Sequence, residues 1–234
     1  MTGSAKYGIG AALAMFAAAA ALPAAAASLK PVTVVELFQS QGCSDCPPAN
    51  ANVMALSDRP DLLALSFGVT YWDQLGWKDT FASPQFTARQ WDYAHAFGRS
   101  EVFTPEVVVN GKADVVGSNR AELEALIDRE APGAAPAITA DHGVIGVGAG
   151  QGTGEVWLVR YDPNIVQVPI ARGENGGRTL PHKDVVKQLL RLGDWSGRAA
   201  HFTLPASPNA AWDTAVLVER GPGGAIIAAG KVPS

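Results

Sequence analysis

The chain has 234 residues, of which 47% are hydrophobic, enough for one large globular domain or two small ones. Its formal net charge is −4, and it contains no run of lysine or arginine. A nucleic-acid partner is therefore disfavoured, because such partners are bound through basic patches. Cysteine occurs only twice, at Cys43 and Cys46.

The first 27 residues have the pattern of a secretory signal peptide. Lys6 supplies a positive charge, residues 8–22 form an alanine-rich apolar stretch, and residues 23–27 supply the small residues of a cleavage site. The apolar stretch is short for a membrane span, which needs roughly 20 residues, although an uncleaved anchor is the alternative. We therefore expect a mature chain of residues 28–234 without a membrane span, located in the periplasm or secreted.

Residues 28–131 alternate between strand and helix patterns. Residues 32–38 are almost continuously apolar, as in a buried parallel strand. Pro47 and the Ser83-Pro84 pair fit the first turns of helices, and Asn110-Gly111 is a hairpin signal. Because the first three strands alternate with helices, we expect them to run parallel and the fourth to return antiparallel. The expected elements are strands over residues 32–38, 61–69, 103–111 and 112–117, and helices over residues 47–57, 84–97 and 120–129.

A second region follows a linker rich in proline, alanine and glycine at residues 131–136. Short strands at regular spacing are typical of a β-sandwich or barrel, and this region has that pattern. Residues 183–192 fit either a helix face or a strand, and residues 173–177 fit a turn, with packing on the first domain as one option. The short apolar runs occupy residues 137–147, 155–161, 165–171, 199–204, 215–219 and 225–229.

Cys43 and Cys46 lie between the first expected strand and the first expected helix. A helix N-terminus stabilises the thiolate, which is the reactive form of cysteine. A bridge between these neighbours closes a very short loop, so it removes little entropy from the unfolded chain and contributes little stability. The pair is therefore predicted to perform redox or metal chemistry, with an inert surface disulfide as the alternative. Cys43 is expected to be the more exposed, attacking thiol, and Cys46 to resolve the mixed disulfide.

A set of motifs within residues 32–128 resembles one protein family. The order of elements, with Cys-X-X-Cys at the first strand–helix junction, is similar to the thioredoxin fold. The set as a whole resembles an exported, thioredoxin-like bacterial family that is largely uncharacterised. The resemblance implies an α/β thioredoxin-like domain over residues 28–131, followed by a smaller mainly-β, sandwich-like domain over residues 132–234. The motifs are VELFQSQGCSDCPPA at residues 35–49, VTYWD at 69–73, GWKD at 76–79, TARQ at 87–90 and TPEVVVNG at 104–111.

The resemblance also implies roles for residues around the thiols. In thioredoxin-like folds the proline matching Pro105 is cis and faces the Cys-X-X-Cys, so that Thr104-Pro105 leaves backbone groups free to pair with a substrate strand. Such enzymes often place an acidic residue late in the first strand, where it exchanges protons with the resolving thiol. Glu36 is the candidate here. A buried carboxylate is costly unless it is paired or protonated, so a structural salt bridge with Arg89 is the alternative.

Aromatic and acidic residues between the second strand and the second helix are candidates for a groove beside the thiols. Trp72, Asp73, Trp77 and Asp79 could line a substrate groove there. Aromatic side chains are also the largest contributors to protein cores, so a purely structural role is the competing interpretation.

Metal binding is a second interpretation of the cysteine pair. Tetrahedral zinc takes four ligands, and none of the four histidines has ligand spacing with another or with the cysteines. Met54 could add a third soft ligand for copper(I), although its helical spacing fits the core. In the leading interpretation we expect no metal and no cofactor.

The sequence favours an exported thiol–disulfide oxidoreductase that acts on a protein or small thiol through Cys43 and Cys46. A redox partner protein that resets the pair is a further option. Oxidation, reduction and isomerisation all remain open. The alternatives are a copper(I)-handling module and a redox-inactive thioredoxin-like protein that recognises a partner through its β domain.

Overall fold

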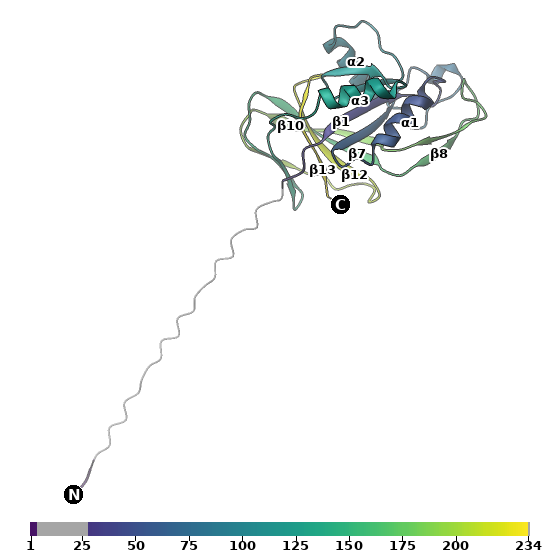
Figure 1. Ribbon diagram of the computed structural model, residues 1–234. Coiled ribbons are helices and arrows are strands. Elements are labelled where there is room, and N and C mark those ends of the chain that lie inside the picture. The colour runs from purple at the N-terminus through teal and green to yellow at the C-terminus, as the bar shows by residue number, and fades with distance from the viewer. Residues whose placement is uncertain (4–27, 234) are drawn as a thin grey trace.

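The structure is a computed structural model that describes residues 1–3 and 28–233 (Figure 1). The signal peptide predicted over residues 1–27 therefore lies almost entirely outside the described residues and stays a prediction. Within the described ranges, no helix has the length and apolarity needed to cross a membrane. The folded part begins near Ser28, which forms an isolated bridge to Thr139.

The secondary structure of residues 28–131 follows the expected pattern. Ser83 caps the second helix by accepting a hydrogen bond from Gln85 N, and Asn119 caps the third by accepting one from Glu122 N. The elements are β1 (Thr33–Gln39), α1 (Cys46–Leu56), β2 (Leu62–Gly68), the short 3-10 helix η1 (Asp73–Leu75), α2 (Pro84–Ala96), β3 (Glu106–Val109), β4 (Ala113–Val116) and α3 (Arg120–Arg129). All residues of β1 and β2 are buried, as expected for central strands.

The direction of β3 differs from the expectation. β1 and β2 run parallel, but β3 pairs antiparallel with β1 and places Glu106 opposite Phe38. The chain between β2 and β3 contains α2 and also a return segment, residues 97–105. This return brings β3 in at the end of the sheet where β1 finishes. Gln90 on α2 holds the return segment by donating a hydrogen bond to Phe103 O.

The described residues after 131 form strands and loops without a helix. Of the ambiguous residues 183–192, those from Val185 onward lie in the long strand β10, whose pairing with β7 decides between the helix and strand interpretations. The strands are β5 (Ile138–Asp141), β6 (Val144–Val147), β7 (Gly154–Asp162), β8 (Val166–Pro169), β9 (Thr179–His182), β10 (Val185–Trp195), β11 (Ala200–Thr203), β12 (Asp213–Glu219) and β13 (Ile226–Val232).

One eight-stranded sheet runs through both halves of the chain, in the order β13-β12-β7-β10-β2-β1-β3-β4. The halves meet where β10 pairs parallel with β2, at Val185 and Ser66. Two smaller sheets, β11-β6-β5 and β8-β9, complete the fold. The sequence predicted a domain boundary between residues 131 and 132. The main sheet includes strands from both sides of this position. Its continuation is favourable because β10 pairs with β2 and covers a strand edge that would otherwise be exposed.

The two faces of the main sheet carry different cores. On one face, α1 and α3, drawn next to each other in Figure 1, pack over Val35 and Leu37 of β1. On the other face, α2 packs over Val34 and Phe38, and this core continues into β7, β10, β12 and β13. Hydrophobic residues from both halves of the chain therefore share one core. A separate core around Trp195 fills the space between β11-β6-β5 and the main sheet.

Candidate functional site

The two cysteines form a disulfide where β1 leads into α1. Their Cα atoms are 5.4 Å apart. Cys46 is the first residue of α1, and Pro47 follows in the first turn, where a missing N–H costs no intrahelical hydrogen bond. The helix dipole is positive at this end, so it favours a thiolate on Cys46 when the disulfide breaks.

Both cysteines are buried, with only 1% of each residue exposed. The expectation that Cys43 would be the more exposed thiol is therefore wrong. The reason is a segment from the second half of the chain, residues 172–178, which lies over the disulfide loop and which we call the cap. Gly173 and Gly177 in the cap have φ values of 79° and 81°, a region that glycine adopts without strain, and these allow the tight turn.

Two side chains of the cap bind the backbone of the disulfide loop. Asn175, which is fully buried, donates from Nδ2 to Gln41 O at 3.0 Å and to Cys43 O at 2.9 Å. Glu174 accepts a hydrogen bond from Ser44 N at 3.0 Å, and this bond lowers the pKa of the Glu174 carboxyl. The sequence pattern predicted a turn here and left packing on the first half as one option. Nothing in it indicated that Asn175 reaches the cysteines.

The segment between β2 and α2 holds the same loop from another side. Gln41 is fully buried, and its Oε1 accepts from Trp77 Nε1 at 2.9 Å and from Thr80 N at 3.2 Å. Asp79 accepts from Gln41 N at 2.7 Å, and burial raises the pKa of Asp79. Asp79 N in turn donates to Asp73 Oδ1 at 3.0 Å. Trp77 and Asp73, considered as substrate-binding residues, thus position the disulfide loop directly or through Asp79.

Trp72 connects the disulfide loop to Thr104 and Pro105. Its Nε1 donates to Thr104 Oγ1 at 2.8 Å. Its Cβ lies close enough to Gly42 that a side chain there would be in van der Waals contact, at 3.5 Å. The Thr104–Pro105 peptide bond is cis, which confirms that expectation. Pro105 directly precedes β3. The first residue of β3, Glu106, pairs with Phe38 near the end of β1, shortly before the disulfide loop. These residues therefore gather at one end of the sheet.

A buried polar cluster that the sequence did not predict lies beneath the start of α1. The Nε2 atom of Gln39 lies 3.2 Å from Asn50 Oδ1, 2.6 Å from Ser66 Oγ and 3.3 Å from His182 Nδ1. Asn50 is one helical turn after Cys46, and both are buried. Burial lowers the pKa of His182 to about 4, so its ring is neutral near pH 7. The inner side of α1 is thus held by uncharged polar groups.

Glu36 lies on the face of the sheet away from the disulfide helix. Side chains alternate along a strand, so Glu36 shares its face with Val34 and Phe38, which pack against α2. The helix α1 packs instead on Val35 and Leu37. The proton-exchange role considered for Glu36 therefore finds no support in its placement.

Glu36 is paired with Arg89, the alternative that the sequence left open. Arg89 Nε donates to Glu36 Oε1 at 2.8 Å, and Arg89 Nη1 donates to Glu219 Oε2 at 2.8 Å. Tyr93 OH accepts from Arg89 Nη2 at 2.7 Å and donates to Glu36 Oε2. All four side chains are buried. The cluster joins β1 and α2 to β12, so it ties the two halves of the chain together.

Stability is expected to depend on pH through Glu219. Burial raises its pKa from 4.5 to about 7 despite the nearby Arg89, and the charges of Glu36 and Glu155 act in the same direction as burial. The folded protein thus keeps this proton to higher pH than the unfolded chain. The raised pKa of Glu219 therefore contributes to the free energy of unfolding. This contribution is fully present below about pH 4.5 and is lost as pH rises through about 7. The melting temperature should therefore fall between about pH 5 and pH 8, and less so in Glu219→Gln. Equal slopes in the two proteins would contradict this assignment.

The copper(I) interpretation lacks its third ligand. Met54 lies eight residues after Cys46 on α1, about 12 Å further along the helix axis. Its sulfur is 3.5 Å from Asn50 Nδ2. Among the described residues, no group of three or more His, Cys, Asp or Glu side chains could hold a metal ion.

Two solved structures resemble this chain. The crystal structure of a protein from Agrobacterium tumefaciens is 31% identical, with a TM-score of 0.72, and the match covers 87% of this chain and 95% of that one. HBP35 of Porphyromonas gingivalis is 13% identical, with a TM-score of 0.51 over 88% of this chain and 76% of that one, which is a likeness of fold alone. No curated protein matches significantly. The profile of a family described as a protein of unknown function (DUF1223) matches residues 34–219, and the chain therefore belongs to that family.

Proposed function

We propose that this protein is an exported thiol–disulfide oxidoreductase that works through Cys43 and Cys46. The observation that carries the proposal is the disulfide at the N-terminus of α1. A bond across so short a loop adds little stability, so a structural role does not account for it. Its position at a helix N-terminus provides a stabilised thiolate leaving group, which thiol–disulfide exchange requires.

The proposal includes a thioredoxin-like fold for the first half of the chain. Strands β1 to β4 and helices α1 to α3 would form the α/β domain, and the strands after residue 131 a mainly-β region. The cis Thr104–Pro105 bond supports this, as does the link that Trp72 makes between Thr104 and the disulfide loop. The substrate would be a protein or a small thiol, and a second redox protein would reset the pair.

Export is part of the same proposal. The predicted signal peptide over residues 1–27 would direct the chain to the periplasm or the exterior, where disulfides persist.

In the oxidising direction, a substrate thiolate attacks Cys43 Sγ. The disulfide bond breaks, and its electron pair leaves on Cys46 as a thiolate. A second substrate thiolate then attacks the substrate sulfur of the mixed disulfide, and Cys43 leaves as a thiolate. The substrate is oxidised to a disulfide by two electrons, the cysteine pair is reduced by two electrons, and the two protons released by the substrate match those the pair can take up. The reducing direction is the reverse.

The burial of both cysteines favours one other function, a redox-inactive protein that binds a partner. A titration of the oxidised protein against a thiol–disulfide buffer distinguishes the two. For an oxidoreductase we expect a reversible two-electron couple between about −270 and −120 mV. A potential below about −300 mV, typical of structural disulfides, would overturn the proposed function.

The two cysteines should behave differently when each is replaced. In reduced Cys46→Ser the attacking thiol remains without its resolving partner, so mixed disulfides with substrates should accumulate. Cys43→Ser, the matched control, should trap little or nothing. Non-reducing gels of both variants after exposure to oxidised substrate proteins measure this. Equal trapping, or trapping by Cys43→Ser alone, would reverse or refute the assigned roles.

A further inference from the structure

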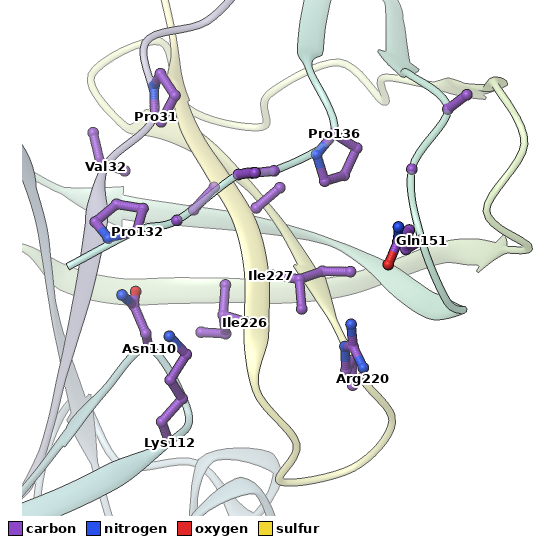
Figure 2. Close-up of a pocket in the computed structure, with 17 residues that line it drawn as sticks. Pro31, Val32, Asn110, Lys112, Pro132, Pro136, Gln151, Arg220, Ile226 and Ile227 are labelled. Atoms are coloured by element: carbon purple, nitrogen blue, oxygen red, sulfur yellow. The ribbon is translucent and has the colours of Figure 1, made fainter. Parts of the chain in front are cut away.

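A cavity lies at the end of the sheet opposite the disulfide. It has a volume of about 490 Å³ and is lined by the linker, residues 132–136, by the start of β1 and by β13. Pro31 and Val32 lead into β1 at this cavity, whereas the disulfide follows the end of β1, about 23 Å away at the usual rise of a strand. Figure 2 shows the linker crossing the strand that carries Ile226 and Ile227. This volume is typical of small-molecule sites.

The lining of the cavity contains two cations and no carboxylate. Lys112 and Arg220 are the charged residues that line it, and the others are apolar residues, glycines and the amides Asn110 and Gln151. Figure 2 places Lys112 beside Asn110 on one side and Arg220 below Gln151 on the other. The whole chain has 22 acidic and 18 basic residues, so this local excess of positive charge runs against the overall balance.

Both cations keep donors for a ligand. The guanidinium of Arg220 has no ion-pair partner among the described residues and lies over Gly152, where a Cβ would be 3.5 Å from Nη2. Lys112 Nζ is 3.9 Å from Glu130 Oε2, and the Glu130 carboxylate also pairs with Arg129 Nε at 3.0 Å. Lys112 is therefore held only loosely.

The amide of Asn110 is part of the wall, and both of its polar atoms are engaged by the protein. Its Oδ1 accepts from Val34 N at 2.7 Å, and its Nδ2 donates to Glu130 O at 2.6 Å. Recognition in this cavity thus depends on the cations and on the apolar lining, to which Ile226 and Ile227 contribute from opposite sides of β13 (Figure 2).

We propose that this cavity binds a small carboxylate with an aliphatic body. The planar guanidinium of Arg220 matches a carboxylate in two parallel hydrogen bonds. The aliphatic part lies against the apolar lining beneath the linker, where it is removed from water. An inorganic anion would leave the apolar lining unused, and a neutral amphiphile would leave both cations unpaired. The site does not depend on the chemistry of the disulfide.

Titration of the isotope-labelled protein with decanoate, below its micelle concentration, tests the site by amide chemical shifts. We expect saturable shifts at Lys112, Gln151, Arg220 and Ile227. Affinity should rise by up to about fourfold for each methylene added from hexanoate to decanoate. Decanol should bind at least about tenfold more weakly than decanoate, because it cannot pair with a guanidinium.

Arg220→Gln should weaken decanoate binding at least about tenfold while leaving decanol binding unchanged. Arg120→Gln, an exposed change on α3, is the matched control and should have no effect. The Cys43→Ser/Cys46→Ser variant should bind decanoate normally, which separates this site from the proposed function.

Equal affinity for decanoate and decanol would overturn the carboxylate assignment. So would unchanged decanoate binding in both Arg220→Gln and Lys112→Gln. Inorganic phosphate binding as tightly as decanoate would overturn the aliphatic assignment, and shifts confined to other regions would overturn the site.

Discussion

Replacing Arg89 by methionine is expected to lower the free energy of unfolding by about 3–5 kcal/mol, because two buried carboxylates lose their cation. Glu36 is fully buried and Glu219 is 1% exposed, and each carboxylate lies 2.8 Å from a nitrogen of Arg89. Methionine keeps much of the apolar stem of arginine, so the measured loss reports mainly the missing charge. Urea unfolding followed by circular dichroism at about pH 8, where Glu219 with its pKa of about 7 is mostly ionised, gives the value.

An exposed ion pair provides the control. Arg59 pairs with Asp61 at the surface, where their side chains are 39% and 57% exposed, so Arg59→Met should cost at most about 1 kcal/mol. Adding Glu36→Gln and Glu219→Gln to Arg89→Met should recover much of the loss, since no buried charge is then left unpaired. Equal losses for Arg89→Met and Arg59→Met would show that the cluster does not tie the two halves together.

Asn175→Ala is expected to accelerate reduction of the disulfide by dithiothreitol about 10- to 100-fold, because two hydrogen bonds of about 1 kcal/mol each hold the cap closed. Both cysteines are 1% exposed, so a reagent needs the cap to open before it can attack. The fraction of molecules with an open cap rises about tenfold for each 1.4 kcal/mol by which the closed state is destabilised. Alkylation of the released thiols at timed intervals, followed by mass spectrometry, measures the rate.

Asn164→Ala is the matched control for the cap. Asn164 also lies in a turn of the second half, but it is exposed, and among the described residues its side chain hydrogen-bonds only to Asp162. Its replacement should leave the reduction rate unchanged. Glu174→Gln should also have a small effect, because the amide oxygen still accepts from Ser44 N. If Asn175→Ala melts normally but is reduced at the original rate, the cap does not limit access to the disulfide.

The elements that the sequence predicted well are those with local signals. Ser83 with Pro84 marks the start of α2, and the turn at Asn110 and Gly111 joins β3 to β4. Features that depend on distant partners were missed. β10 is a strand because β7 pairs along it, and its contact with β2 at Val185 could not be read from either segment. β3 runs antiparallel to β1 because of the return segment, residues 97–105. That segment has no periodic pattern of apolar residues from which its path could be predicted.

The site shows the same division. The disulfide was predictable because its two cysteines are neighbours in sequence. The cap was not, because the hydrogen bond between Asn175 and Cys43 joins residues 132 positions apart. The sequence also did not show on which face of the sheet the Glu36 side chain lies, because its neighbours in the strand are all apolar: Val34, Val35, Leu37 and Phe38. With apolar residues on both faces of β1, alternation does not tell which face α1 covers.

The distance in sequence between the cysteines and the cap has a consequence for how the protein is made. A growing or translocating chain presents Cys43 and Cys46 long before Asn175 has emerged, since 132 positions separate Asn175 from Cys43. During that interval the thiols are accessible to any cellular oxidant, and the bond between them needs no distant partner to form. Once the cap docks, the same bond is enclosed. The bond can therefore form before the cap exists, whereas in the folded protein its exchange with a thiol requires the cap to open.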